Sequence, residues 1–209
     1  MQRSVSPAPV AAITAAVLFV AAVLGYGALF PAFSQLQHPV AALGASGVPH
    51  ALAFNLIGFV LPGLLAAFAA QTLRGRMGDA PYVARLGVQA LTLAAVAFAA
   101  LGLMPLDSGD LLSSASRLHA ATWTFWWVAV VVGATLLGLG MRGTRHAPRS
   151  WAVTACALVT LLFAIILPGV IPVGLSQRIA FAAWFAATYL MAPSRAAAST
   201  SGSSPTGPT

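Results

Sequence analysis

The chain has 209 residues, of which 59% are hydrophobic and only 6% are charged, and its mean hydropathy is +0.90. A soluble domain of this length has too small an interior to bury so much apolar surface, so the composition excludes one and indicates an integral membrane protein. The formal net charge is +7, from ten arginines and three aspartates. Because these arginines lie in short loops, where they orient helices in a membrane, we expect no nucleic-acid partner.

Six apolar runs follow one another along the chain, at about 9–30, 50–73, 82–104, 118–141, 151–171 and 173–190. Runs of about 20 residues match a hydrocarbon core of roughly 30 Å. The sequence therefore predicts an all-α bundle of six transmembrane helices over residues 1–192. The first run is longer than the apolar region of a signal peptide, so we expect it to be retained. Residues 193–209 are rich in Ser, Pro, Gly and Thr, which predicts a disordered cytoplasmic tail.

The arginines are distributed unevenly between the two sides of this predicted bundle. Arg117 and Arg178 fall on one side, and the other eight fall on the opposite side: Arg3, Arg74, Arg76, Arg85, Arg142, Arg145, Arg149 and Arg195. Cytoplasmic loops carry an excess of basic residues, so we expect both termini to be cytoplasmic in a bacterial inner membrane. The connector 31–50, the loop after residue 104 and the turn before residue 173 then share the outer face.

Polar side chains that are far apart in the sequence meet on this outer face. The set comprises His38, His50, Asn55, Asp107, Asp110, Arg117, His119, Trp123, Gln177 and Arg178. We expect them to form an outward-facing polar pocket that binds a ligand. A carboxylate next to the membrane is costly unless it is paired. We therefore expect Asp107 or Asp110 to contact Arg117 or Arg178.

His119 shares a helical face with Trp123, Trp126 and Trp127. Two interpretations remain open: a titratable imidazole at the mouth of an aromatic-lined cavity, or a histidine in an aromatic belt at the membrane surface. Asp107 and His119 are the candidate acid–base pair for catalysis. A divalent metal is the one cofactor that these residues suggest. Its candidate ligands are His38, His50, Asp107 and His119, although their spacing follows no metal motif.

Two further patterns lie inside the apolar runs. Asn55 and Gln89 carry amides that need a partner in hydrocarbon, so we expect both to face the bundle interior and to bond another helix. The tripeptide Leu-Pro-Gly occurs at 61–63 and again at 167–169, in the second helix of each three-helix half. Such a repeat would be inverted, as in many transporters.

Four motifs together resemble a family. They are a His-Pro-x-x-x-Leu-Gly connector, an Asn-x-x-Gly-Phe segment, a Pro-x-Asp followed about a dozen residues later by His, and a Gly-Leu-x-(Gln or Glu)-Arg turn before a Trp. In this chain they correspond to His38, Pro39, Leu43 and Gly44; to Asn55, Gly58 and Phe59; to Pro105, Asp107 and His119; and to Gly174, Gln177, Arg178 and Trp184. The chain resembles the domain of unknown function 998 family of bacterial six-helix membrane proteins. It departs from the pattern at Ala42, where a serine is expected, and at Met104, where Phe is usual. The resemblance implies that the outward polar residues form one unit, and it implies no particular activity.

The residues thus favour an inner-membrane protein whose outward pocket binds a lipid or another amphipathic molecule, with membrane lipids as its partners. An intramembrane enzyme, acid–base or metal-dependent, that acts on a lipid-like substrate is the first alternative. A small transporter is the second, although the middle of most spans has no ionisable residue.

Overall fold

A computed structural model describes residues 6–193, and all its regular elements are helical. They are α1 (Pro7–Ala28), the 3-10 helix η1 (Val40–Gly44), α2 (Ala51–Asn55), η2 (Leu56–Val60), α3 (Leu61–Gly75), α4 (Tyr82–Leu103), α5 (Ser114–Gly140), α6 (Ala147–Leu161), η3 (Leu162–Ile166), η4 (Leu167–Gly169) and α7 (Val173–Met191). Within these residues there is no strand, so the predicted all-α class is confirmed. The predicted tail lies outside the described residues, apart from Pro193.

Five helical segments are long and apolar enough to cross a membrane: α1, the continuous helix Ala51–Gly75, α4, α5 and the continuous helix Ala147–Gly169. Their outward surfaces are also apolar, since side chains such as Val17 and Leu24 are more than half exposed. A surface of this kind suits contact with lipid. α7 packs beside them but is not among the five. Ser176, Gln177 and Arg178 in its first turns lower its hydropathy.

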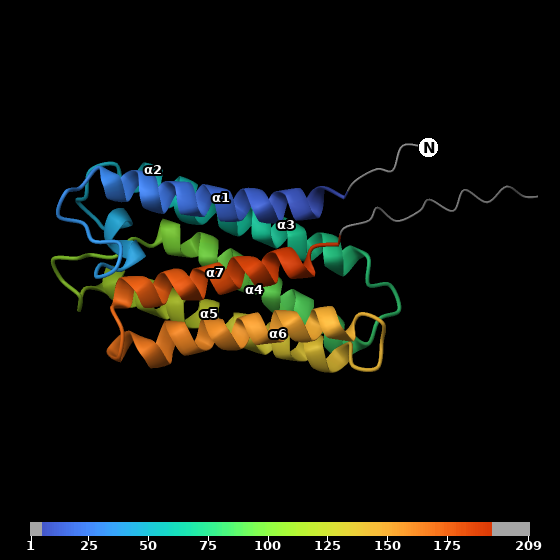
Figure 1. The fold of residues 1–209 in the computed structure, drawn as a ribbon. Helices are drawn as coiled ribbons and strands as arrows, with labels where there is room; N and C mark the ends of the chain where they lie inside the picture. The colour runs from blue at the N-terminus through green and yellow to red at the C-terminus, as the bar shows by residue number, and fades with distance from the viewer. Residues whose placement is uncertain (1–5, 194–209) are drawn as a thin grey trace, which may run out of the picture.

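The helical segments run alternately up and down, and their connections gather at two ends (Figure 1). One end, which we call the connector end, holds residues 29–50, 104–113 and 170–172. Hydrogen bonds join these segments to their neighbours, from Ser46 N to Leu106 O (2.8 Å) and from Leu175 N to Leu36 O (3.0 Å). The other end, which we call the terminal end, holds the start of α1, the end of α7 and the turns 76–81 and 141–146. The predicted meeting of three distant segments at one face is thus observed.

Two helices begin earlier than the apolar runs predict. α5 begins at Ser114 rather than near residue 118, because the Ser113 hydroxyl accepts a hydrogen bond from Ser116 N and caps the helix. α6 begins at Ala147 rather than near residue 151, and Pro148 lies in its first turn, where a proline is well tolerated. Hydropathy marks the buried or lipid-facing part of a helix, whereas caps mark its true end.

The two Leu-Pro-Gly tripeptides do not mark an inverted repeat. Each follows a π-helical segment, η2 or η3, which widens the helix where a proline removes one N–H donor. However, 61–63 lies near the middle of the continuous helix Ala51–Gly75, whereas 167–169 lies at the end of the continuous helix Ala147–Gly169. Inverted symmetry would place them at opposite depths.

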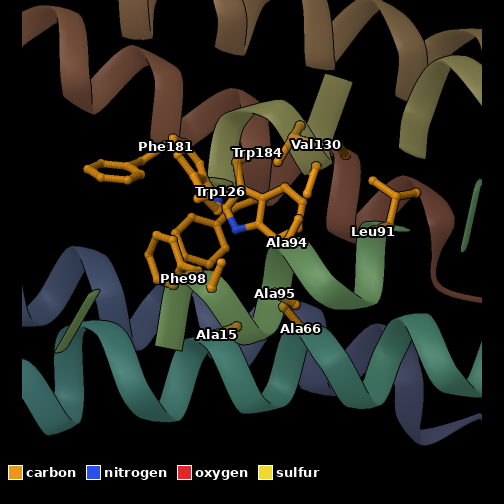
Figure 2. Close-up of a cluster of buried hydrophobic side chains, with 14 of the residues drawn as sticks. Ala15, Ala66, Leu91, Ala94, Ala95, Phe98, Trp126, Val130, Phe181 and Trp184 are labelled. Atoms are coloured by element: carbon orange, nitrogen blue, oxygen red, sulfur yellow. The ribbon is translucent and has the colours of Figure 1, made fainter. Parts of the chain in front are cut away.

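The core is aromatic where α4, α5 and α7 meet (Figure 2). The Trp126 ring lies 6.0 Å from Phe98, 5.3 Å from Phe181 and 6.2 Å from Trp184, measured between centroids. Trp126 and Trp184 are fully buried, and their indole N–H groups have no hydrogen-bond partner among the described residues. Trp126 is therefore a core residue and does not belong to a belt at the membrane surface.

Glycines set how closely α4 and α5 approach. A Cβ added at Gly87 would lie 2.5 Å from Leu137 N, and one added at Gly133 would lie 2.8 Å from Gly87 O. These contacts are with backbone, which cannot move aside. Small residues at such crossings let membrane helices pack at short range.

We predict that Gly87→Ala destabilises the bundle by about 1–3 kcal/mol, because the new methyl group forces α4 away from α5. Thermal unfolding in detergent measures the change. Gly25→Ala is the matched control, since nothing lies within 4 Å of its added Cβ. Equal unfolding temperatures for the two variants would contradict the close approach.

Candidate functional site

Arg178 and Gln177, in the first turns of α7, hold the connector against the bundle. The Arg178 guanidinium donates from Nε and Nη2 to Gln35 Oε1 (3.0 and 2.6 Å). Its Nη1 donates to His38 O (3.1 Å) and to Gly174 O (2.8 Å). Gln177 Oε1 accepts a hydrogen bond from Val40 N (2.9 Å). Backbone outside regular helix needs hydrogen-bond partners, and α7 supplies them here.

Asn55 makes a second connection to the connector. Its Nδ2 donates to Gly44 O (2.9 Å), and the side chain is only 6% exposed. A Cβ at Gly44 would overlap the Asn55 amide, so a larger residue there would displace that side chain. The expectation that Asn55 faces the interior is confirmed, although its partner is the short helix η1 and not a membrane span. Gln89 does bond another helix, through Gln71 (2.9 Å), but both side chains are exposed.

The predicted ion pairs of Asp107 and Asp110 with Arg117 or Arg178 are wrong. Asp107 Oδ1 accepts from Gly109 N (3.0 Å) and Asp110 N (3.2 Å), and Asp110 Oδ1 accepts from Leu112 N (2.8 Å). Arg117 is exposed. The loop 104–113 has amide groups without helical partners, and a nearby Asp side chain satisfies them at a smaller entropic cost than a distant arginine.

Ser116 fixes the same loop from the first turn of α5. Its buried hydroxyl accepts from Asp107 N (3.2 Å) and lies 3.0 Å from Asp107 O and 2.9 Å from Asp110 O. Sequence reasoning overlooked this residue. Its signal was the run Ser113-Ser114-x-Ser116 at a helix start, where hydroxyl groups cap free backbone groups.

His119, Trp123 and Gln177 do come together, around a cavity of about 210 Å³ at the connector end. His119 Nδ1 lies 2.7 Å from Met104 O. Because a carbonyl oxygen only accepts, Nδ1 carries the proton and Nε2 is left as an acceptor. Phe59 and Phe181 line the same cavity. The cavity can therefore hold a small, mainly apolar group that donates one hydrogen bond.

The other two histidines lie apart from this cavity. His38 is exposed, stacks on Phe33 with centroids 5.4 Å apart, and accepts from Ser34 N through Nδ1 (2.8 Å). His50 is exposed and has a left-handed backbone conformation, with φ of 63°. Among residues 6–193, no three His, Cys, Asp or Glu side chains are grouped so that they could hold a metal ion. His38, His50, Asp107 and His119 therefore do not form a three-ligand metal site in this fold.

Sequence reasoning also missed an apolar groove between α1 and α7. It has a volume of about 530 Å³ and includes Arg178 at the connector end. Small residues spaced four apart line both sides, Ala12 and Ala16 on α1 and Ala182 and Ala186 on α7. That spacing places small side chains on one helical face and was the available signal.

The groove and the His119 cavity are neighbours separated by phenylalanine rings. Phe19 lines the groove and Phe181 lines the cavity. Their centroids are 5.0 Å apart in an edge-to-face arrangement. Ligands in the two spaces would share this wall.

Comparison of the chain with models of protein families, with curated proteins and with solved structures finds no match.

We predict that Ser116→Ala loosens the loop 104–113, because the Asp107 amide and two carbonyls lose a buried partner at a cost of about 1–3 kcal/mol. Faster hydrogen exchange at residues 106–110 measures the effect. Ser114→Ala, which alters an exposed hydroxyl in the same turn, is the control. Unchanged exchange in Ser116→Ala would refute the bracing role of Ser116.

Proposed function

We propose that this multi-pass membrane protein binds an amphiphile with an acyl chain and an anionic head, in the groove between α1 and α7. The observation that carries the proposal is the position of Arg178. It is the charged side chain in a groove whose other lining residues are Ala, Val, Ile, Leu, Phe and Tyr.

The groove suits an extended hydrocarbon chain. Its lining on α1 runs from Ala12 to Leu24, which spans about 18 Å at the helical rise of 1.5 Å per residue. Val17, Val20 and Leu24 are at least half exposed along it, so an occupant would bury apolar area. The alanines of both helices keep the groove open.

Arg178 suits an anionic head at one end of that chain. Its hydrogen bonds go to the neutral oxygens of Gln35, His38 and Gly174, so none of them cancels the positive charge. The Phe33 ring lies 5.8 Å from the guanidinium carbon. One N–H of Nη2 remains for a ligand once these bonds are counted. A carboxylate or phosphate would supply the missing negative charge.

We also propose an orientation of the chain in a bacterial inner membrane and its membership of a family. The excess of arginine at the terminal end supports a cytoplasmic location for that end in a bacterial inner membrane, with the connector end outward. Membership of the domain of unknown function 998 family is supported by the way its motifs meet. His38 bonds Arg178, Gly44 bonds Asn55, and the connector bonds Gln177.

The enzyme and transporter alternatives have less support. His119 opens on a cavity, but Asp107, its proposed acid–base partner, is bonded to its own loop. A transporter needs a polar path between the two ends, whereas Trp126 and Trp184 fill the centre of the bundle.

We predict that the purified full chain binds a fluorescent fatty acid about tenfold more tightly than the fatty alcohol of equal length, because only the acid gains a charge-assisted bond to Arg178. Fluorescence titration in detergent measures both affinities. Arg178→Gln should abolish the difference. Arg178→Lys should keep it, which separates the charge from the bonds that hold the connector.

Ala182→Phe should weaken binding of both probes, because the ring fills the groove. Ala121→Phe is the matched control on an exposed face of α5 away from the groove. Equal affinities for acid and alcohol, or no effect of Ala182→Phe, would reject the groove as the binding site.

A further inference from the structure

A second, basic cavity lies at the terminal end, away from the groove's arginine. It has a volume of about 640 Å³, is open to the surface on one side, and is bordered by the ends of α3, α5, α6 and α7. Arg76, Arg145, His146 and Arg149 line it. Basic side chains from two separate turns therefore converge on one space.

Among the described residues that line this cavity there is no Asp or Glu to cancel the charges of Arg145 and Arg149. Arg149 donates to Leu190 O and, from Nη2, to Ala192 O (2.7 Å). These carbonyls hold the side chain in place without neutralising it. Arg145 Nε donates to His146 Nε2 (3.2 Å), and its two Nη groups have no partner among the described residues. They are available to a ligand.

Two further features of the cavity bear on its ligand: one favours an anion and the other favours an attached acyl chain. α6 begins at Ala147 beside these residues, and no side chain caps its first turn. The positive end of the helix dipole thus adds to the arginines. Met77, Leu137, Met141 and Leu190 give the cavity an apolar lining as well. A fully hydrated ion gains nothing from such a surface, whereas the acyl chains of a lipid bury apolar area against it.

We propose that this cavity binds a phosphate ester, with Arg145 and Arg149 contacting the phosphate oxygens. Arginine donates paired hydrogen bonds that match phosphate geometry, and basic pockets between membrane helices bind anionic lipid heads in this way. The phosphate has two possible sources, an anionic phospholipid of the surrounding leaflet or a soluble phosphate compound. The site is independent of the groove between α1 and α7, which has its arginine at the other end.

Native mass spectrometry of the full chain in detergent tests the proposal, with short-chain phosphatidylglycerol as the probe and phosphatidylcholine of the same chains as its comparison. We expect phosphatidylglycerol to bind more tightly. Arg145→Gln should weaken its binding about tenfold, the loss expected for a hydrogen bond to a charged group. Arg142→Gln should leave it unchanged, because Arg142 is exposed in the same turn but does not line the cavity.

Repeating the titration in the Ala182→Phe protein separates this site from the groove, and the effect of Arg145→Gln should persist there. Adding inorganic phosphate identifies the source of the phosphate. If inorganic phosphate displaces phosphatidylglycerol, the ligand is a soluble phosphate compound; if it does not, the ligand is the lipid. If Arg145→Gln and Arg142→Gln weakened the binding of phosphatidylglycerol equally, general surface charge would explain the binding, and the proposal would be overturned. Equal binding of the two lipids would overturn it as well.

Discussion

The hydrogen bonds from Arg178 to the connector are the interaction on which the connector end depends. Residues 29–50 contain little regular helix apart from η1, so many of their backbone groups need hydrogen-bond partners outside a helix. Arg178 reaches Gln35, His38 and Gly174 at once. Gly174 makes the approach possible, because a Cβ there would lie 2.5 Å from His38 O. A lysine could replace the charge but could not reproduce this fork.

The shortage of acidic residues explains much of the electrostatics. The chain has three aspartates and ten arginines. Asp107 and Asp110 accept hydrogen bonds from backbone amides of their own loop. The arginines that the structure describes are therefore bonded mainly to neutral oxygens, as Arg149 and Arg178 are. Such bonds fix the geometry of a guanidinium and leave its charge in place. Both proposed sites follow from this property, one at each end of the bundle.

The two ends differ in what accompanies the charge. At the connector end a single half-buried arginine stands beside a long apolar groove. At the terminal end several basic groups surround a wider cavity. A chain with one small anionic head fits the first, and a phosphate fits the second. Trp126 and Trp184, which are fully buried in the aromatic core, lie between the two ends.

Hydropathy alone determined the helical class and five helical segments that are long and apolar enough to cross a membrane. It also determined that the connector, the loop 104–113 and the 170–172 turn meet at one end, because helices that alternate in direction bring every second connection to the same end. It also indicated that Asn55 needs an interior partner. Only the tertiary structure decided which polar groups meet. Asp107 bonds the nearest backbone amides instead of Arg178, and His119 bonds the Met104 carbonyl. Bonds to local backbone groups form at a smaller entropic cost than bonds to distant charges. The groove and the basic cavity depend on how helices far apart in sequence pack, and periodicity within one helix does not contain that information.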